Sequence, residues 1–297
     1  MIDYRYHALS LAAVLFALAL GVLIGVAIGD TNLVSSAKSG IVHDLNSEVN
    51  GARKQVGQLH GQLTEEEAFA GGLYPLAVHE LLSGQSIGLV FLGGSSDNAN
   101  TLVRAAVTQA GGDLSTVVAV REPLDLAGLA RDAAGTRFTA LGESPELVGG
   151  FGEIAGRQLV SGGRLVGREL LSRVRGSLLS AFDGQLRKLN SVVVMRADPA
   201  GMTPQQTEAS AALESGLLNG IAAAGATAVG VQMKDTEPSQ IPWYKGRNIS
   251  SVDDLDALAG QAALVYALAG RHGSFGASST ADSLLPSPQA PTSTTQH

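Results

Sequence analysis

The sequence predicts an α/β protein. A single N-terminal transmembrane helix and a coiled-coil stalk precede an open, mostly parallel sheet of the Rossmann-like or flavodoxin-like kind. Three observations carry this prediction: a long uncharged apolar run, a heptad pattern behind it, and short apolar strands that alternate with helices. The predicted parts are a cytoplasmic N-terminus at 1–7, a transmembrane helix at 8–28, a coiled coil at 31–66, an α/β domain at 84–272 and a disordered tail at 277–297.

The apolar run at residues 8–28 contains no charge, and Ser10 is its only polar side chain. At about 1.5 Å per residue it crosses the roughly 30 Å hydrocarbon core of a bilayer once. A cleaved secretory signal is the alternative, because small residues precede Asp30. Signal sequences have a shorter apolar region of about 7–15 residues, however, so the sequence favours a retained signal anchor.

The charges beside the run predict its orientation. Arg5 and the free amine lie on the amino side, and Lys38 is the nearest cation on the other side. Because cations concentrate on the cytoplasmic side, we expect a cytoplasmic N-terminus and an extracytoplasmic α/β domain.

The composition excludes some classes of function. The net charge of −7 argues against nucleic-acid binding, which depends on a basic face. The chain has no cysteine, so cysteine usage indicates no redox compartment. No Ser–His–Asp order and no Gly-x-Ser-x-Gly elbow occurs, and we expect no enzyme.

A heptad seam follows the apolar run. Its apolar residues alternate spacings of three and four over about three repeats, with charged residues on the other faces. A monomeric helix that folds back on the domain is the alternative. We favour a parallel homodimer through residues 42–63, since the anchor aligns two chains side by side. The seam residues are Val42, Leu45, Val49, Ala52, Val56, Leu59 and Leu63.

The α/β pattern begins after residues 70–75, where Ala-Gly-Gly-Leu-Tyr-Pro predicts the end of the helix. Continuous short apolar runs predict buried strands at 86–92, 116–120, 191–195 and 227–233. Residues 137–141 are interpreted as a further strand, and 146–160 and 168–189 as helices. Thr203 and Pro204 predict the start of another helix. An acidic loop at 248–256 precedes a last apolar element at 261–269, either strand or helix.

Three of these features together carry a resemblance to a known family. They are YHALSLAAV at 6–14 leading into the apolar run, the coiled coil, and SVDDLD at 251–256 before the last apolar element. In this arrangement the chain resembles the actinobacterial MctB family, which is named for a copper transport protein assigned to the outer membrane. The resemblance implies a role in copper homeostasis and an outer-membrane location. It also implies an envelope protein partner that governs cell-wall hydrolysis and cell separation.

The residues themselves do not form a recognisable copper site. Copper favours Cys, Met and His ligands, and copper is expected here from the resemblance alone, with no other cofactor. The strands are short, continuously apolar and separated by helices, whereas a transmembrane barrel needs strands of about ten alternating residues. The histidines and the methionines after the anchor are scattered: His7, His43, His60, His79, His272 and His297, and Met195, Met202 and Met233.

Two loops contain candidate binding residues. The turn Gly93, Gly94, Ser95, Ser96 and Asp97 follows a strand and precedes a helix, where backbone N–H groups can hold the anion of a cofactor. The alternative is a plain turn in which Ser or Asp caps the helix.

The second loop holds the candidate metal ligands, Asp253, Asp254 and Asp256, with His272 as a separate candidate. The alternatives are a solvated acidic loop that caps the next element, and a surface histidine. Trp243 and Tyr244 either anchor a partner or cover the sheet edge.

We therefore expect a non-enzymatic, single-pass envelope protein related to copper transport, which acts by scaffolding or partner binding and not as a barrel pore. One alternative is a coiled-coil regulator of cell-wall hydrolysis and cell separation. A second is an α/β domain that binds a nucleotide or a sugar.

Overall fold

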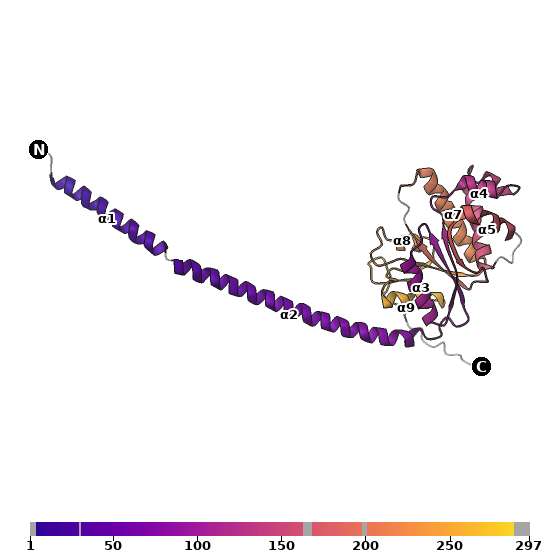
Figure 1. Ribbon diagram of the computed structural model, residues 1–297, viewed down its shortest axis with the longest axis horizontal. Helices are drawn as coiled ribbons and strands as arrows, with labels where there is room; N and C mark the ends of the chain where they lie inside the picture. The colour runs from indigo at the N-terminus through magenta and orange to yellow at the C-terminus, as the bar shows by residue number, and fades with distance from the viewer. Residues whose placement is uncertain (1–3, 30, 163–167, 198–200, 288–297) are drawn as a thin grey trace, which may run out of the picture. The chain divides into compact units, whose positions relative to one another are not determined.

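The computed structural model describes residues 4–29, 31–162, 168–197 and 201–287 (Figure 1). The chain divides into two compact units, residues 1–68 and 69–297. The elements in order are α1 (Tyr4–Ile28), α2 (Thr31–Val78), β1 (Ser86–Leu92), α3 (Asp97–Gln109), β2 (Asp113–Val120), α4 (Leu126–Asp132), the 3₁₀ helix η1 (Arg137–Ala140), α5 (Pro145–Val160), α6 (Arg168–Leu178), β3 (Leu179–Gly184), β4 (Ser191–Arg196), α7 (Pro204–Ala223), β5 (Thr227–Val231), α8 (Ile241–Lys245), β6 (Ser250–Val252), α9 (Leu258–Leu268) and β7 (Ser274–Phe275).

The helix α1 contains one stretch, Arg5–Ala27, that is long and apolar enough to cross a membrane. Its side chains are exposed along their whole described length, as expected where lipid and not protein surrounds a helix. A signal sequence near the N-terminus also meets this criterion of length and composition, so the helix by itself is weak evidence for a retained anchor.

The helix α2 continues beyond the predicted end at residue 66 and through the predicted break at 70–75. Pro75 lies inside it, one turn before its end. The last turn is held by packing within the second unit: Val78 is fully buried and Tyr74 contacts the same apolar cluster. The hydroxyl of Tyr266 also donates to the carbonyl of Ala77. These contacts offset the helix-breaking tendency of proline and the two glycines before it.

The second unit is built on a seven-stranded sheet in the order β3-β2-β1-β4-β5-β6-β7. Among the described strands β3 alone is antiparallel to its neighbour, and the rest are parallel. The strand predicted at 86–92 is confirmed, and those at 116–120, 191–195 and 227–233 match β2, β4 and β5 with shifted ends. Thr203 caps α7 as predicted, in a capping box with Gln206.

Two predictions for the middle of the chain are wrong. Residues 137–141 form a 3₁₀ turn and not a strand, because its three-residue repeat buries both Phe138 and Leu141. The helix predicted at 168–189 ends at Leu178, and β3 follows as the edge strand on β2. The backbone groups along the outer edge of β2 form hydrogen bonds with this segment. The sequence of the segment itself contains no pattern that predicts this pairing.

The end of the chain is more ordered than expected. Part of the predicted acidic loop is strand β6, the last apolar element is the helix α9, and β7 follows it. The first part of the predicted disordered tail makes specific contacts. Gly276 N–H donates to Ser283, and Lys245 pairs with Asp282 at 2.7 Å. Residues 288–297 lie outside the described part of the chain.

Helices cover both faces of the sheet (Figure 1). One core contains residues from α4, α5, α6 and α7, and the other contains residues from α3, α9 and the end of α2. The central strands β1, β2 and β4 are buried on both faces, which explains why they are largely apolar.

Glycines bring α5 and α7 into backbone contact. A Cβ on Gly156 of α5 would overlap the carbonyl oxygen of Leu217. A Cβ on Gly216 of α7 would likewise overlap the carbonyl oxygen of Gly149. Gly152 and Gly220 are equally restricted by the facing backbone. Only glycine therefore permits this helix spacing.

We expect Gly156→Ala to lower the free energy of unfolding by about 1–3 kcal/mol, because the added methyl forces the two helices apart. Gly150→Ala is the matched control on the same helix, since its Cβ would meet nothing within 4 Å. It should raise stability by up to about 1 kcal/mol through helix propensity. The measurement is equilibrium unfolding of the full chain in detergent micelles, followed by fluorescence of the single tryptophan, Trp243. Equal effects of the two substitutions would contradict the contact.

Candidate functional site

The sheet has a topological switch point between β1 and β4. From β1 the chain crosses through α3 to β2 on one side, whereas β4, β5, β6 and β7 lie on the other side. In open α/β sheets the crevice at the carboxyl ends of the two strands beside this point is the usual ligand site. The predicted turn at 93–97 and Arg196 occupy those ends.

The predicted turn after β1 is built as a helix cap. Gly93 has φ +105°, a conformation that favours glycine, and the Ser96 hydroxyl accepts from the N–H of Ala99 at 3.2 Å. Asp97 opens α3, and Gly94 and Ser95 are exposed. A Cβ on Gly93 would lie 2.8 Å from Oε2 of Glu122.

A buried ion pair lies at the carboxyl end of β4. Nε of Arg196 donates to both carboxylate oxygens of Glu214, at 3.0 and 3.2 Å, and Nη1 donates to Gln240 at 2.6 Å. Glu214 is on α7 and is buried. Burial raises the pKa of its carboxyl to about 7, although the positive charge of Arg196 opposes this shift.

Aromatic side chains complete the Arg196 cluster. The guanidinium carbons of Arg247 and Arg196 lie 3.9 and 5.0 Å from the centroid of the Trp243 ring. The hydroxyl of Tyr244 accepts from the backbone N–H of Arg196 at 2.9 Å, and burial raises the pKa of this phenol. A Cβ on Gly230 would overlap the Tyr244 ring. Tyr244 is thus part of the core, while Trp243 is a half-buried platform for two cations.

Two aspartates of the predicted acidic loop, Asp253 and Asp254, are buried, whereas Asp256 is exposed. Asp253 is buried and accepts from the N–H groups of Ala277 and Ser278 at 3.0 and 2.9 Å, so it holds the start of the tail. Asp256 accepts from the N–H of Lys234 at 2.9 Å. The N-cap of α9 is Ala257, which has no side-chain hydrogen bond, so no aspartate of this loop caps the helix.

Asp254 is buried beside this bond network. Its Oδ1 has no hydrogen-bond partner within the described chain. Burial and the negative charges of Asp253 and Asp256 raise the pKa of its carboxyl to about 6.

The structure does not assemble the predicted metal ligands. The imidazole of His272 is exposed and lies 3.5 Å from the Ser250 hydroxyl. Across the described ranges no three His, Asp or Glu side chains are grouped to hold a metal ion. A metal role for the three aspartates or for His272 stays an untested prediction.

The Arg196–Glu214 cluster escaped the sequence analysis, because its members come from separate elements. One signal was available. Glu214 is followed at positions i+3, i+4 and i+7 by Leu217, Leu218 and Ile221, which places this charge on the buried face of a helix. A buried charge requires a partner, and Arg196 follows a clearly predicted strand.

The raised pKa of Glu214 predicts a pH dependence of stability. Between its ordinary pKa of 4.5 and about 7, the folded protein keeps a proton that the unfolded chain has released. The free energy of unfolding should therefore fall as the pH rises through this window. Relative to Glu214→Gln, the parent chain should lose on the order of 2 kcal/mol between pH 5 and pH 7.5. Thermal unfolding of both chains at a series of pH values measures this difference. A constant difference would contradict the assignment, and Asp254 does not interfere because both chains contain it.

Comparison with known proteins identifies the family. The family model described as "Copper transport outer membrane protein, MctB" matches residues 1–286. Proteins named "Copper transporter MctB" from Mycobacterium bovis and two strains of Mycobacterium tuberculosis are 32% identical to the chain over 122 residues. This alignment covers 41% of the chain and 38% of those relatives. The resemblance predicted from the sequence is confirmed. Because the family model matches nearly the whole length, the chain belongs to the MctB family of copper transport outer membrane proteins.

Proposed function

We propose that the chain takes part in copper homeostasis as a single-pass, membrane-anchored protein without enzymatic activity. It acts by placing its α/β domain where an envelope partner binds, and not as a pore. The observation that carries this proposal is the family match, which runs through α1, α2 and the α/β domain without interruption. The assignment to copper comes from the family description and from the names of the relatives.

The anchor is the first part of the proposed mechanism. The helix α1 has the length of a membrane span and no charged side chain after Arg5, and its large side chains are exposed, among them Leu11, Phe16 and Leu23. The position of Arg5 supports a cytoplasmic N-terminus and an extracytoplasmic domain. The family description refers to the outer membrane, and the membrane that this chain occupies is part of the proposal.

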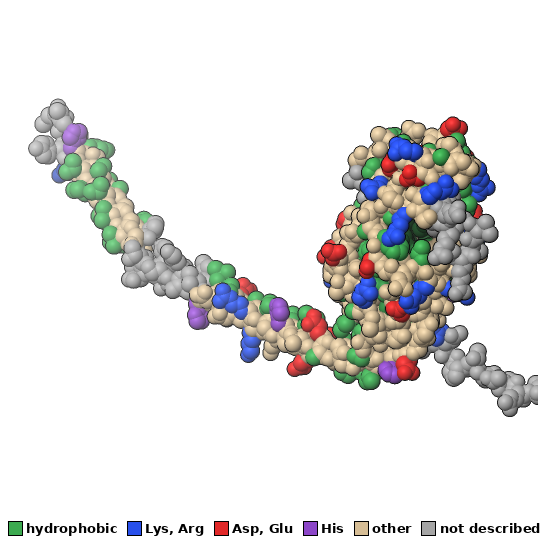
Figure 2. Space-filling view, turned by 45° about the vertical axis from the view of Figure 1, so that its right-hand side comes forward, with side chains coloured by type: hydrophobic (Ala, Val, Ile, Leu, Met, Phe, Trp, Pro, Cys, Tyr) green, Lys and Arg blue, Asp and Glu red, His purple; other side chains and the backbone are tan. Residues whose placement is uncertain are grey.

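Pairing of the helix α2 with that of a second copy is the second part of the proposed mechanism. Leu45, Val49, Val56, Leu59 and Leu63 of the seam are 45–57% exposed in the single chain. Figure 2 shows hydrophobic side chains along α2 mixed with charged ones. The side chain of Val42 lies outside the described part. A heptad stripe of this kind is buried when two parallel helices pack together, and a shared membrane anchor favours that encounter. We therefore assign the seam to a parallel homodimer.

The α/β domain supports a binding role. If the antiparallel edge strand β3 is left out, its parallel strands have the order of a flavodoxin-like sheet. Helices cover both faces, which is the arrangement of a globular binding domain and not of a barrel. At the switch point the turn after β1 serves as the cap of α3, with the Ser96 hydroxyl bound to the N–H of Ala99, so a protein partner is preferred to a nucleotide as the ligand.

Deletion of the gene tests the proposal. The deletion strain should accumulate more copper and should stop growing at a lower copper concentration than the parent strain. The full chain should restore both properties, whereas a chain without residues 4–29 should not, because its domain is no longer anchored. Zinc accumulation serves as the control for metal specificity. Unchanged copper content and tolerance would refute the copper role, and chains of unseparated cells in that strain would instead favour a role in cell-wall hydrolysis.

A further inference from the structure

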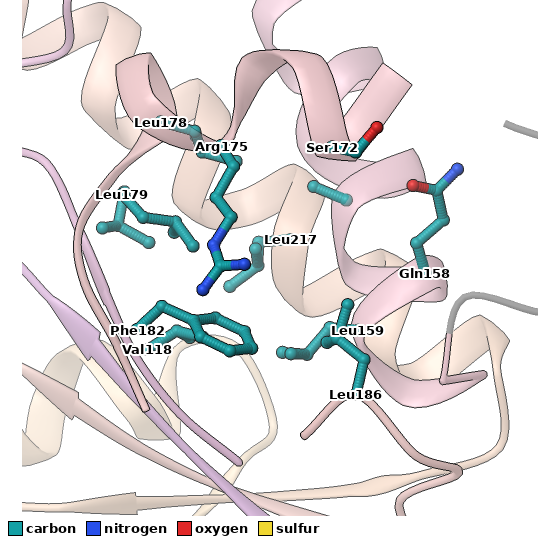
Figure 3. Close-up of a pocket in the computed structure, with 12 residues that line it drawn as sticks. Val118, Gln158, Leu159, Ser172, Arg175, Leu178, Leu179, Phe182, Leu186 and Leu217 are labelled. Atoms are coloured by element: carbon teal, nitrogen blue, oxygen red, sulfur yellow. The ribbon is translucent and has the colours of Figure 1, made fainter. Parts of the chain in front are cut away.

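An apolar cavity of about 150 Å³ lies between the β2–β3 edge of the sheet and the helices α5, α6 and α7 (Figure 3). Its walls include Val118 of β2, Leu159 of α5, Leu178 of α6, Phe182 of β3 and Leu217 of α7. A dry apolar cavity of this volume accommodates a ligand the size of benzene. The cavity shares no lining residue with the Arg196 cluster, although Leu217 and Glu214 both belong to α7.

One cation, on the exposed residue Arg175, lines the edge of this apolar space. Figure 3 shows Arg175 extending from α6 between the leucines and over the Phe182 ring. The guanidinium carbon is 3.6 Å from the ring centroid, which is a close cation–π contact. Within the described residues no carboxylate pairs with Arg175. Figure 2 shows a hollow of the domain that is lined by hydrophobic side chains and bordered by Lys or Arg side chains.

A second polar group lines the cavity from a different wall. Gln158 of α5 is only 1% exposed, and both its Oε1 and its Nε2 are buried without a hydrogen-bond partner in the described part of the chain. Figure 3 shows its amide on the α5 side, across the cavity from Arg175. A buried amide without partners destabilises the empty protein, and a ligand that supplies a donor or an acceptor removes this cost.

We propose that the cavity binds a small amphipathic carboxylic acid. Its apolar body, one aromatic ring or a short alkyl chain, packs against Leu159, Phe182 and Leu217. Its carboxylate pairs with the guanidinium of Arg175, and a second polar group of the ligand hydrogen-bonds to the amide of Gln158. Arginine is suited to this role because its planar donors match a carboxylate. The small volume excludes long-chain fatty acids.

The test is saturation-transfer NMR on the full chain in lipid nanodiscs, with benzoate, 4-hydroxybenzoate and hexanoate as probes and empty nanodiscs as the reference. At least one probe should bind saturably. Arg175→Gln should weaken that binding about tenfold, because a charge-assisted hydrogen bond is lost. Arg173→Gln is the matched control on α6, since Arg173 is exposed like Arg175 but does not line the cavity, and it should bind as the parent does.

Gln158→Leu separates a binding role from a structural one. It should weaken binding of 4-hydroxybenzoate and raise the melting temperature, because it removes an amide that has no partner in the empty protein. A lower melting temperature would show that Gln158 serves the fold instead, and would overturn its assignment as a ligand group. The absence of saturable binding for all three probes, or unchanged binding in Arg175→Gln, would overturn the proposed site.

Discussion

The backbone contact between α5 and α7 positions most of what the α/β domain presents to a ligand or partner. Glycines on both helices let the carbonyl oxygens of one helix meet the backbone of the other. This spacing places Leu217 of α7 beside Leu159 of α5 in the wall of the apolar cavity. It also directs Glu214 of the same helix to Arg196 at the end of β4. Both regions therefore depend on a contact that a single methyl group would disturb.

The charges at the switch point and those at the β2–β3 cavity are arranged differently. At the switch point the buried Glu214 is closely paired with Arg196, and two arginines lie against Trp243. A buried pair of this kind fixes the geometry of the groups around it more than it stabilises the fold. In the cavity near β3 the cation is next to an aromatic ring and has no carboxylate partner among the described residues. The Arg196–Glu214 pair holds neighbouring groups in position, whereas the guanidinium of Arg175 is available to pair with a ligand carboxylate.

The sequence allowed the prediction of those elements whose signal is local. The strand Ser86–Leu92 is a continuous apolar run, and the start of α7 has a Thr–Pro cap, so both were predicted correctly. The strand β3 is specified by the open edge of β2, and the end of α2 by packing of Val78, which no short window reveals. The candidate site residues also divide into those with a local sequence signal and those brought together only by the fold. The turn at 93–97 was found by its position after a strand, whereas Arg196 and Glu214 come together only in the folded sheet.

We propose an anchored pair of chains whose α/β domains are held at a membrane. The central claim is the pairing of α2, and disulfide crosslinking in isolated membranes tests it most directly. The natural chain has no cysteine, so each introduced thiol is the sole one. Val49→Cys and Val56→Cys lie on the seam, and Lys54→Cys lies on the opposite face of the heptad and serves as the control. The account predicts covalent dimers for both seam variants and few for the control. Monomers alone, or equal crosslinking at all three positions, would contradict it.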